Sequence, residues 1–401
     1  MLRKPPRCPL GLTLTIAVAA AAPLCSAQAN PNLQTYFREY VGMTADQIVS
    51  VRTGQPITKI LPSRAPAEIF LIGAIYIDSS PERYLELSRD FERLRAVPGY
   101  LAIRQFSNPP QLSDLNGFTL DSDEINMLKS CLPGNCQLQM PSSVIEDLQR
   151  TVDQSAPEAE ERVNRILQTT ALDRLIAYQR EGNQVLGSYN DKRDQTDVAR
   201  QFAYMLSYSK ALPRYLPDFY NYLLAYPKGK PENVEEMFYW ARVRFGLKPT
   251  LRVVQVLTRK GERPDEPAYA IAEKQLYSSH YFQTALDLTF CIRDRDEPRR
   301  QGFYLVKVMG SEQAGLTGLK GGVVRKVAVE RSASSLQKSL AVIKNLLEEG
   351  EPRLEGRPGA RAVRTMDSQG GIRPERSALR QPGATRPYNG PPVEVPPPHP
   401  G

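Results

Sequence analysis

Apolar residues follow two different periods along the chain, and the first stretch predicts a strand followed by a helix. Residues 69–77 are apolar almost throughout, which is typical of a buried strand. Ser80 is placed to cap the following helix, and Pro81 suits the first helical position. One continuous apolar stripe is expected on this helix, formed by Tyr84, Leu87, Phe91 and Leu94. A Pro-Gly pair should end the helix, and a second strand is expected over residues 100–106.

The middle of the chain, from Asp121 to about Tyr226, has apolar residues at helical spacing and is expected to be mainly helical. Three stripes indicate separate helices: Val163, Ile166, Leu167, Leu175 and Ile176; Val198, Phe202, Met205 and Leu206; and Tyr215, Phe219, Tyr222 and Tyr226. Asp121 with Glu124 fits a helix N-cap and its capping partner, as Thr44 with Gln47 does near the start of the chain.

From Phe238 onward the period changes to two, which predicts strands joined by short turns. The expected strands cover residues 238–245, 251–258, 268–276, 286–292 and 303–309. In the fourth strand one face is formed by Leu286, Leu288, Phe290 and Ile292. A long amphipathic helix follows, with a stripe of Leu336, Leu340, Ile343 and Leu347. The predicted fold class is therefore α+β, with an antiparallel sheet gripping a long C-terminal helix and carrying a large helical insertion.

The two ends of the chain differ from this middle. Residues 1–29 have the features of a cleaved signal peptide: a basic start, an apolar run over 10–24 and an Ala-x-Ala site ending at Ala29. Cys25 follows a leucine rather than a small residue, so lipid attachment is not expected. Residues 351–401 are rich in Pro, Gly and Arg and are expected to be a disordered tail.

Between these ends, the expected organisation is a core interrupted by a helical insertion. Residues 30–120 and 236–350 would form the core, and residues 121–235 the insertion or subdomain. No later segment is apolar for long enough to cross a membrane, so no transmembrane segment is expected in the mature protein. The protein is expected to act in the periplasm or outside the cell.

The net charge of +8 changes this picture little. The expected signal peptide holds three of the positive charges and the tail a net three more, which leaves about +2 for the folded part. A nucleic-acid-binding protein concentrates basic charge on its folded surface, so nucleic acid is not an expected partner.

The cysteines agree with export. Cys131 and Cys136 flank a Pro-Gly turn, and in an oxidising compartment they are expected to form a local disulfide. Two cysteines alone do not provide the four ligands of a zinc site, and no cofactor or metal site is expected. Cys291 lies in an alternating strand pattern and is expected to be a small buried residue.

One resemblance is carried by this order of elements and by a short motif. Residues 74–84 read Ala-Ile-Tyr-Ile-Asp-Ser-Ser-Pro-Glu-Arg-Tyr, and residues 90–94 read Asp-Phe-Glu-Arg-Leu. This text, with the later strands and the final helix, resembles the START-like (helix-grip) superfamily and a group of uncharacterised secreted bacterial proteins. The resemblance implies a curved sheet gripping the last helix over a cavity that holds a lipid or another hydrophobic ligand. It implies no catalytic residue.

Residues 274–282 are the densest group of functional-looking side chains. His280 lies between Tyr277 and Tyr281, and Lys274 is one strand-length away, so these residues and Tyr304 are the candidate ligand-binding set. His280 could also act as an acid or base near neutral pH, or it could simply be hydrogen-bonded inside the protein. The glycine-rich stretch 315–322 lacks the ending of a phosphate-binding loop and is expected to be a turn.

Three functions fit these observations. The favoured one is non-enzymatic binding of a hydrophobic or amphipathic small molecule, or a lipid, in a helix-grip cavity. The second is an envelope scaffold that binds a protein partner through its aromatic helices and tail. The third is a cyclase- or hydrolase-type enzyme built around His280, although no hydrolase motif is present.

Overall fold

The computed structural model describes residues 33–96, 99–153, 156–189, 196–245, 248–294, 301–313, 315–316 and 318–349. The expected signal peptide and tail lie outside these residues. All described residues belong to one compact unit. Its strands are β1 (Ile57–Leu61), β2 (Glu68–Ile77), β3 (Tyr100–Gln105), β4 (Ser188–Tyr189), β5 (Thr196–Asp197), β6 (Val234–Phe245), β7 (Lys248–Lys260), β8 (Tyr269–Ser278), β9 (Phe282–Arg293) and β10 (Phe303–Gln313).

The helices fall into three groups along the chain. The first group precedes the sheet or follows its first long strand: α1 (Leu33–Glu39), α2 (Ala45–Arg52), α3 (Pro81–Arg89) and α4 (Phe91–Ala96). The second lies between β3 and β6: η1 (Leu112–Leu115), α5 (Ser122–Leu128), α6 (Ser142–Thr151), α7 (Ala159–Glu181), η2 (Gly182–Leu186), α8 (Val198–Tyr208), α9 (Ala211–Tyr215) and α10 (Pro217–Ala225). The third is the single long helix α11 (Gly318–Glu348).

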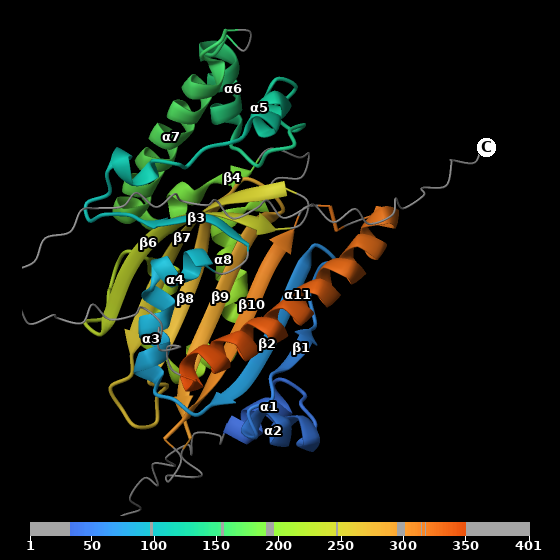
Figure 1. Ribbon diagram of the computed structural model, residues 1–401, viewed down its shortest axis with the longest axis vertical. Coiled ribbons are helices and arrows are strands. Elements are labelled where there is room, and N and C mark those ends of the chain that lie inside the picture. The colour runs from blue at the N-terminus through green and yellow to red at the C-terminus, as the bar shows by residue number, and fades with distance from the viewer. Residues whose placement is uncertain are drawn as a thin grey trace, which may run out of the picture. The chain divides into compact units, whose positions relative to one another are not determined.

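Eight strands form one sheet in the order β1-β2-β10-β9-β8-β7-β6-β3, and each neighbouring pair is antiparallel. Side chains alternate between the two faces of this sheet. One face, which we call the α11 face, packs against α3, α4 and α11, which Figure 1 shows in front of the strands. The opposite face, which we call the insertion face, packs against helices from the segment between β3 and β6. The α+β fold with its sheet, C-terminal helix and helical insertion is therefore confirmed.

Helix α11 reaches the sheet at a glycine. Leu336 and Leu340 of α11 are buried, and they lie over Gly73 of β2. A Cβ atom on Gly73 would be 2.8 Å from Cδ1 of Leu340 and 2.9 Å from Cδ2 of Leu336. Real Cβ contacts are not that short, so the missing side chain lets the helix approach the strand closely.

Three local predictions needed correction. The expected single helix after Ser80 is two helices, because Asp90 leaves helical geometry and its carboxylate accepts a hydrogen bond from the Arg93 backbone N–H at 3.0 Å. The aromatic helix is likewise interrupted at Leu216, which precedes a proline and is therefore biased away from helical geometry. The expected turn at 315–322 instead contains the start of α11, where Gly321 passes close to the Leu316 backbone.

The expected helix caps are present. The capping boxes of Thr44 with Gln47 and of Asp121 with Glu124 both form, and Ser80 caps α3. The expected disulfide between Cys131 and Cys136 is also present, and Cys291 is a buried free thiol. Among the described residues, no helix combines the length and apolar character needed to cross a membrane.

A buried polar network ties the insertion to the sheet. The guanidinium of Arg242 in β6 donates to Asp121 at 2.7 Å, to Glu124 at 3.1 Å and to the Thr119 carbonyl at 2.9 Å. The other oxygen of Glu124 lies 3.0 Å from Nε2 of His280. Glu124 and His280 are both buried, so this network fixes the start of α5 against two parts of the sheet.

Candidate functional site

Four charged side chains lie together on the α11 face, each on a different strand. They are Arg252 of β7, Glu273 of β8, Asp287 of β9 and Lys307 of β10, and we call them the charged cluster. Residues an even number of positions away on the same strands share this face. They include the buried apolar residues Val254, Ile271, Cys291 and Leu305. The cluster is thus a charged group within a mainly apolar face of the sheet. Its four strands, β7 to β10, lie next to one another (Figure 1).

The register brings the two carboxylates together. Glu273 and Asp287 are direct cross-strand partners in the β8–β9 pair, where Cβ atoms are about 4.5–5.5 Å apart. Lys307 pairs with Thr289, so it is the diagonal neighbour of Asp287 on the next strand. Arg252 donates to the side chain of Gln275 at 3.0 Å. Two like charges side by side are flanked by one cation on each side.

The surroundings of the cluster change the pKa values of Asp287 and Lys307. Burial raises the pKa of Asp287 to about 6, and the charge of Glu273 adds to this rise while Lys307 and Arg252 oppose it. Burial by itself would lower the pKa of Lys307, but Tyr84 and the two carboxylates outweigh it and raise that pKa. Both shifts follow from the burial of the two groups and from the charges around them.

Three tyrosine hydroxyl groups also belong to the candidate site. Tyr84 of α3 and Tyr239 of β6 are buried, and Tyr100 of β3 is partly buried. Burial raises the pKa of all three hydroxyls, and Glu273 adds to the rise in each case. All three therefore stay protonated at neutral pH and can donate hydrogen bonds.

The charged groups do not neutralise one another by direct contact. Within the described part of the chain, no nitrogen of Lys307 or Arg252 lies within 4.0 Å of a carboxylate oxygen of Glu273 or Asp287. All four side chains also keep part of their surface exposed. Charges that are largely surrounded by protein and lack a direct ion-pair partner are costly, so their presence on this face makes it the candidate functional site.

We expect Asp287 to titrate near pH 6 and its pKa to fall in Glu273→Gln, because the neighbouring negative charge is then removed. The pKa in the folded protein exceeds the unfolded value of 3.8, so this contribution to stability is present below pH 3.8 and is lost as pH rises through 6. Carboxyl ¹³C NMR of the full chain measures the pKa. Glu330→Gln, an exposed change on α11, is the control, and an unshifted Asp287 in Glu273→Gln would show that the two carboxylates do not interact.

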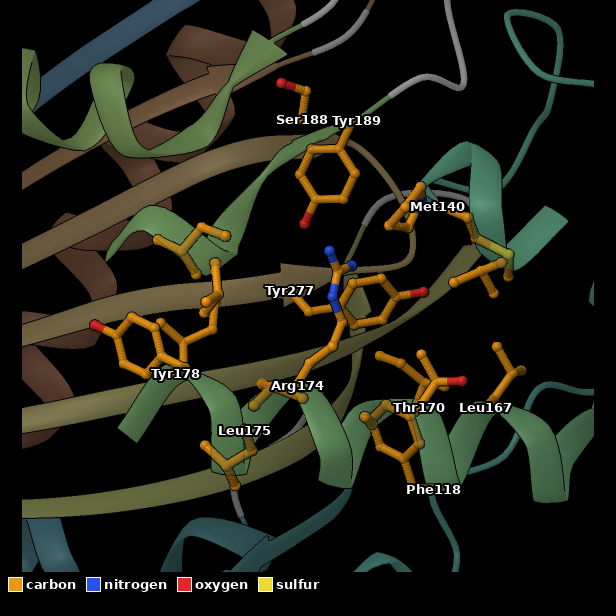
Figure 2. Close-up of a pocket in the computed structure, with 18 of the residues that line it drawn as sticks. Phe118, Met140, Leu167, Thr170, Arg174, Leu175, Tyr178, Ser188, Tyr189 and Tyr277 are labelled. Carbon is orange, nitrogen blue, oxygen red and sulfur yellow. The ribbon is translucent and has the colours of Figure 1, made fainter. Parts of the chain in front are cut away.

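The candidate residues taken from the sequence lie elsewhere. Lys274 follows Glu273 directly and therefore points to the insertion face, where its ammonium group donates to the Tyr178 hydroxyl at 3.1 Å and also contacts Asn183. It is buried, and burial lowers its pKa to about 7. Tyr277 lines a pocket on this same face (Figure 2). Tyr178 also lines this pocket, whereas Lys274 is not among its lining residues.

The other three candidates are not gathered with them. His280 is buried against Glu124, as in the interpretation of a histidine bonded inside the protein. The hydroxyl of Tyr281 accepts a hydrogen bond from the Lys248 backbone N–H at 2.9 Å. Tyr304 packs on the ring of Tyr76 and donates to Asp294. His280 and Tyr281 have neighbouring rings at the turn between β8 and β9, whereas Tyr304 lies on β10, and each contacts a different part of the fold.

Sequence reasoning missed the charged cluster although a signal for it was present. Three of the four members, Arg252, Asp287 and Lys307, each interrupt an apolar run, as in Leu286-Asp287-Leu288 and Val306-Lys307-Val308. Such a charge in the centre of a covered strand is unusual and can mark a site. Among the described residues, no three His, Cys, Asp or Glu side chains are placed to hold a metal ion.

Comparisons of this chain with models of known protein families, with curated proteins and with solved structures give no match.

Proposed function

We propose that the protein binds a small amphipathic molecule on the α11 face, with the polar head group of that molecule at the charged cluster. The observation that carries this proposal is the set of two carboxylates and two cations on adjacent strands that make no direct ion pair. A head group that bears both charges could contact both kinds of side chain. The apolar residues around the cluster would then contact the rest of the ligand.

The chemistry of the cluster favours a zwitterionic head group over a purely anionic or neutral one. Lys307 and Arg252 can donate charge-assisted hydrogen bonds to an anionic group such as a phosphate. Glu273 and Asp287 attract a cationic group, and the rings of Tyr84 and Tyr239 offer cation–π contacts to it. Because the cluster sums to about zero charge with all four groups ionised, a ligand of zero net charge matches it.

The START-like resemblance supports this location. Helices α3 and α4 follow β2 in the chain, and the long helix α11 follows β10. The resemblance implies a ligand between the sheet and the last helix, and we propose that relationship for this protein. The Cys131–Cys136 bridge is a bond that persists in oxidising compartments, and we propose that the protein acts in one, after export.

The proposal is tested with three probes of equal chain length: octylphosphocholine, which is zwitterionic, octyl glucoside, which is neutral, and octanoate, which is anionic. Isothermal titration of the full chain should give the tightest binding for octylphosphocholine. Lys307→Met and Asp287→Asn should each weaken that binding by roughly tenfold or more, since a charge-assisted hydrogen bond contributes about 1.5–3 kcal/mol. Their effect on octyl glucoside should be small.

Lys326→Met is the matched control, because this exposed lysine lies on α11 away from the cluster. It should leave all three affinities unchanged. Equal binding of the three probes, or no binding of octylphosphocholine, would contradict the proposal. Variants that lower stability but leave the octylphosphocholine affinity intact would assign the cluster a structural role instead.

Acid–base catalysis is a second candidate function at the same place. The specific observation in its favour is Asp287, whose pKa of about 6 lets it both hold and release a proton near neutral pH. Its direct partner Glu273 and the protonated Tyr84 provide a second carboxylate and a hydrogen-bond donor. The titration of Asp287 described above therefore bears on this function as well.

A further inference from the structure

The insertion face carries a separate pocket of about 80 Å³, between the sheet and the helices of the insertion (Figure 2). Its walls come from α6, α7, η2, β4, β7 and β8. Most lining residues are apolar, including Phe118, Met140, Leu167, Leu175, Leu251 and Leu276. The protein thus has an apolar hollow on the side of the sheet that faces away from α11.

Arg174 is the one charged side chain among the described residues that line this pocket. It lies on the pocket side of α7, because Thr170, Arg174 and Tyr178 follow one another at a spacing of four. Figure 2 shows Arg174 extending from α7 into the pocket, with the other labelled lining residues around it. Helix α7 thus contributes one cation, Arg174, to a pocket whose other walls are mainly apolar.

The guanidinium of Arg174 has no ion pair within the part of the chain that the structure describes. The side chain is only partly exposed. Hydroxyl groups of Thr170, Ser188, Tyr189 and Tyr277 belong to the same lining. A guanidinium presents a planar fork of donors that matches a carboxylate, and nearby hydroxyls can donate to the same oxygens.

We propose that this pocket binds a short-chain carboxylate, with the carboxylate group on Arg174 and the hydrocarbon tail against the apolar walls. Size sets the length of the tail. An apolar cavity of about 150 Å³ holds a benzene molecule, so a volume about half as large suits a tail of a few carbon atoms. The charge of Arg174 selects the acid over a neutral molecule of the same shape.

This site is independent of the proposed function, because the two lie on opposite faces of the same strands. Leu251 and Val253 of β7 line the pocket, while Arg252 between them belongs to the charged cluster. Likewise Glu273 of β8 faces α11 while Tyr277 of that strand lines the pocket, because the β7–β8 pairing shifts register between Gln275 and Tyr277 and reverses the alternation there. Failure of either ligand to bind leaves the other proposal standing.

The test is a titration of the full chain with ¹³C-labelled butyrate and, separately, with 1-butanol as the neutral match, followed by NMR. Butyrate should bind more tightly than butanol. Arg174→Met should weaken butyrate binding by roughly tenfold or more and leave butanol binding nearly unchanged. Arg174→Lys should restore part of the butyrate affinity, since it returns the charge without the planar fork.

Two further variants separate binding from folding. Arg162→Met removes an exposed arginine from the same helix and should change neither affinity. Ala171→Leu adds three carbon atoms to a lining residue and should abolish binding of both probes. The proposal is overturned if butyrate binds no better than butanol, if neither probe binds, or if Ala171→Leu leaves butyrate binding intact.

Discussion

Replacing Arg242 by methionine should lower the free energy of unfolding by about 3–5 kcal/mol, because it removes one partner of a buried ion pair. Arg242 bridges Asp121 and Glu124, and its own side chain is only 16 % exposed. Without it, Glu124 keeps only His280 and its hydrogen bond from the Asp121 backbone inside the protein. The buried carboxylate of Glu124 then has too few favourable contacts to offset the free-energy cost of removing it from water.

Urea denaturation of the full chain measures this effect. Arg244→Met is the matched control, because Arg244 lies two residues further along the same strand and is exposed. Its cost should stay within about 0.5 kcal/mol. Equal costs for the two variants would mean that the network around Glu124 contributes little to stability. The double variant Arg242→Met with Glu124→Leu should recover part of the loss, since it removes the unpaired charge as well.

Leu340→Ala should cost about 2–5 kcal/mol, the range observed when a buried leucine is truncated. Leu340 is fully buried and lies directly over Gly73, where little neighbouring structure can move in to fill the space. The same truncation should weaken octylphosphocholine binding, because α11 covers the face that carries the charged cluster. The apolar stripe of α11, formed by Leu336, Leu340, Ile343 and Leu347, packs this helix against the sheet.

The control for this prediction is Val342→Ala on the same helix, where the side chain is 51 % exposed. Thermal and urea unfolding should show a change of no more than about 0.5 kcal/mol for that variant. If Leu340→Ala is equally mild, then α11 is held by other contacts and the close approach at Gly73 has no energetic weight.

The strands after Phe238 and the last helix were predictable because their side chains alternate clearly between apolar and polar. The stripe of Leu286, Leu288, Phe290 and Ile292 does share the insertion face, as its spacing predicted. Local signals were also sufficient for the capping boxes and for the Cys131–Cys136 bridge, since each depends on residues only a few positions apart.

The charged cluster could not be assembled in the same way. Its four members come from four strands, and their contacts depend on register. The β8–β9 register is set at a turn in which Tyr281 has a φ of 64°, a value that a sequence rarely predicts for a residue other than glycine. Choosing Lys274 instead of Glu273 moved the candidate site to the other face of the sheet, because consecutive residues of a strand point to opposite faces.

Strands β7 and β8 each contribute side chains to both proposed sites, and this has a thermodynamic consequence. If filling the pocket beside Tyr277 shifts β8, the position of Glu273 shifts with it, so the two affinities become linked. Linkage is reciprocal: whatever factor butyrate applies to the affinity for octylphosphocholine, octylphosphocholine must apply to the affinity for butyrate. Because the two sites share strands of one sheet, that sheet can couple the binding of a carboxylate on one face to the binding of an amphipathic ligand on the other.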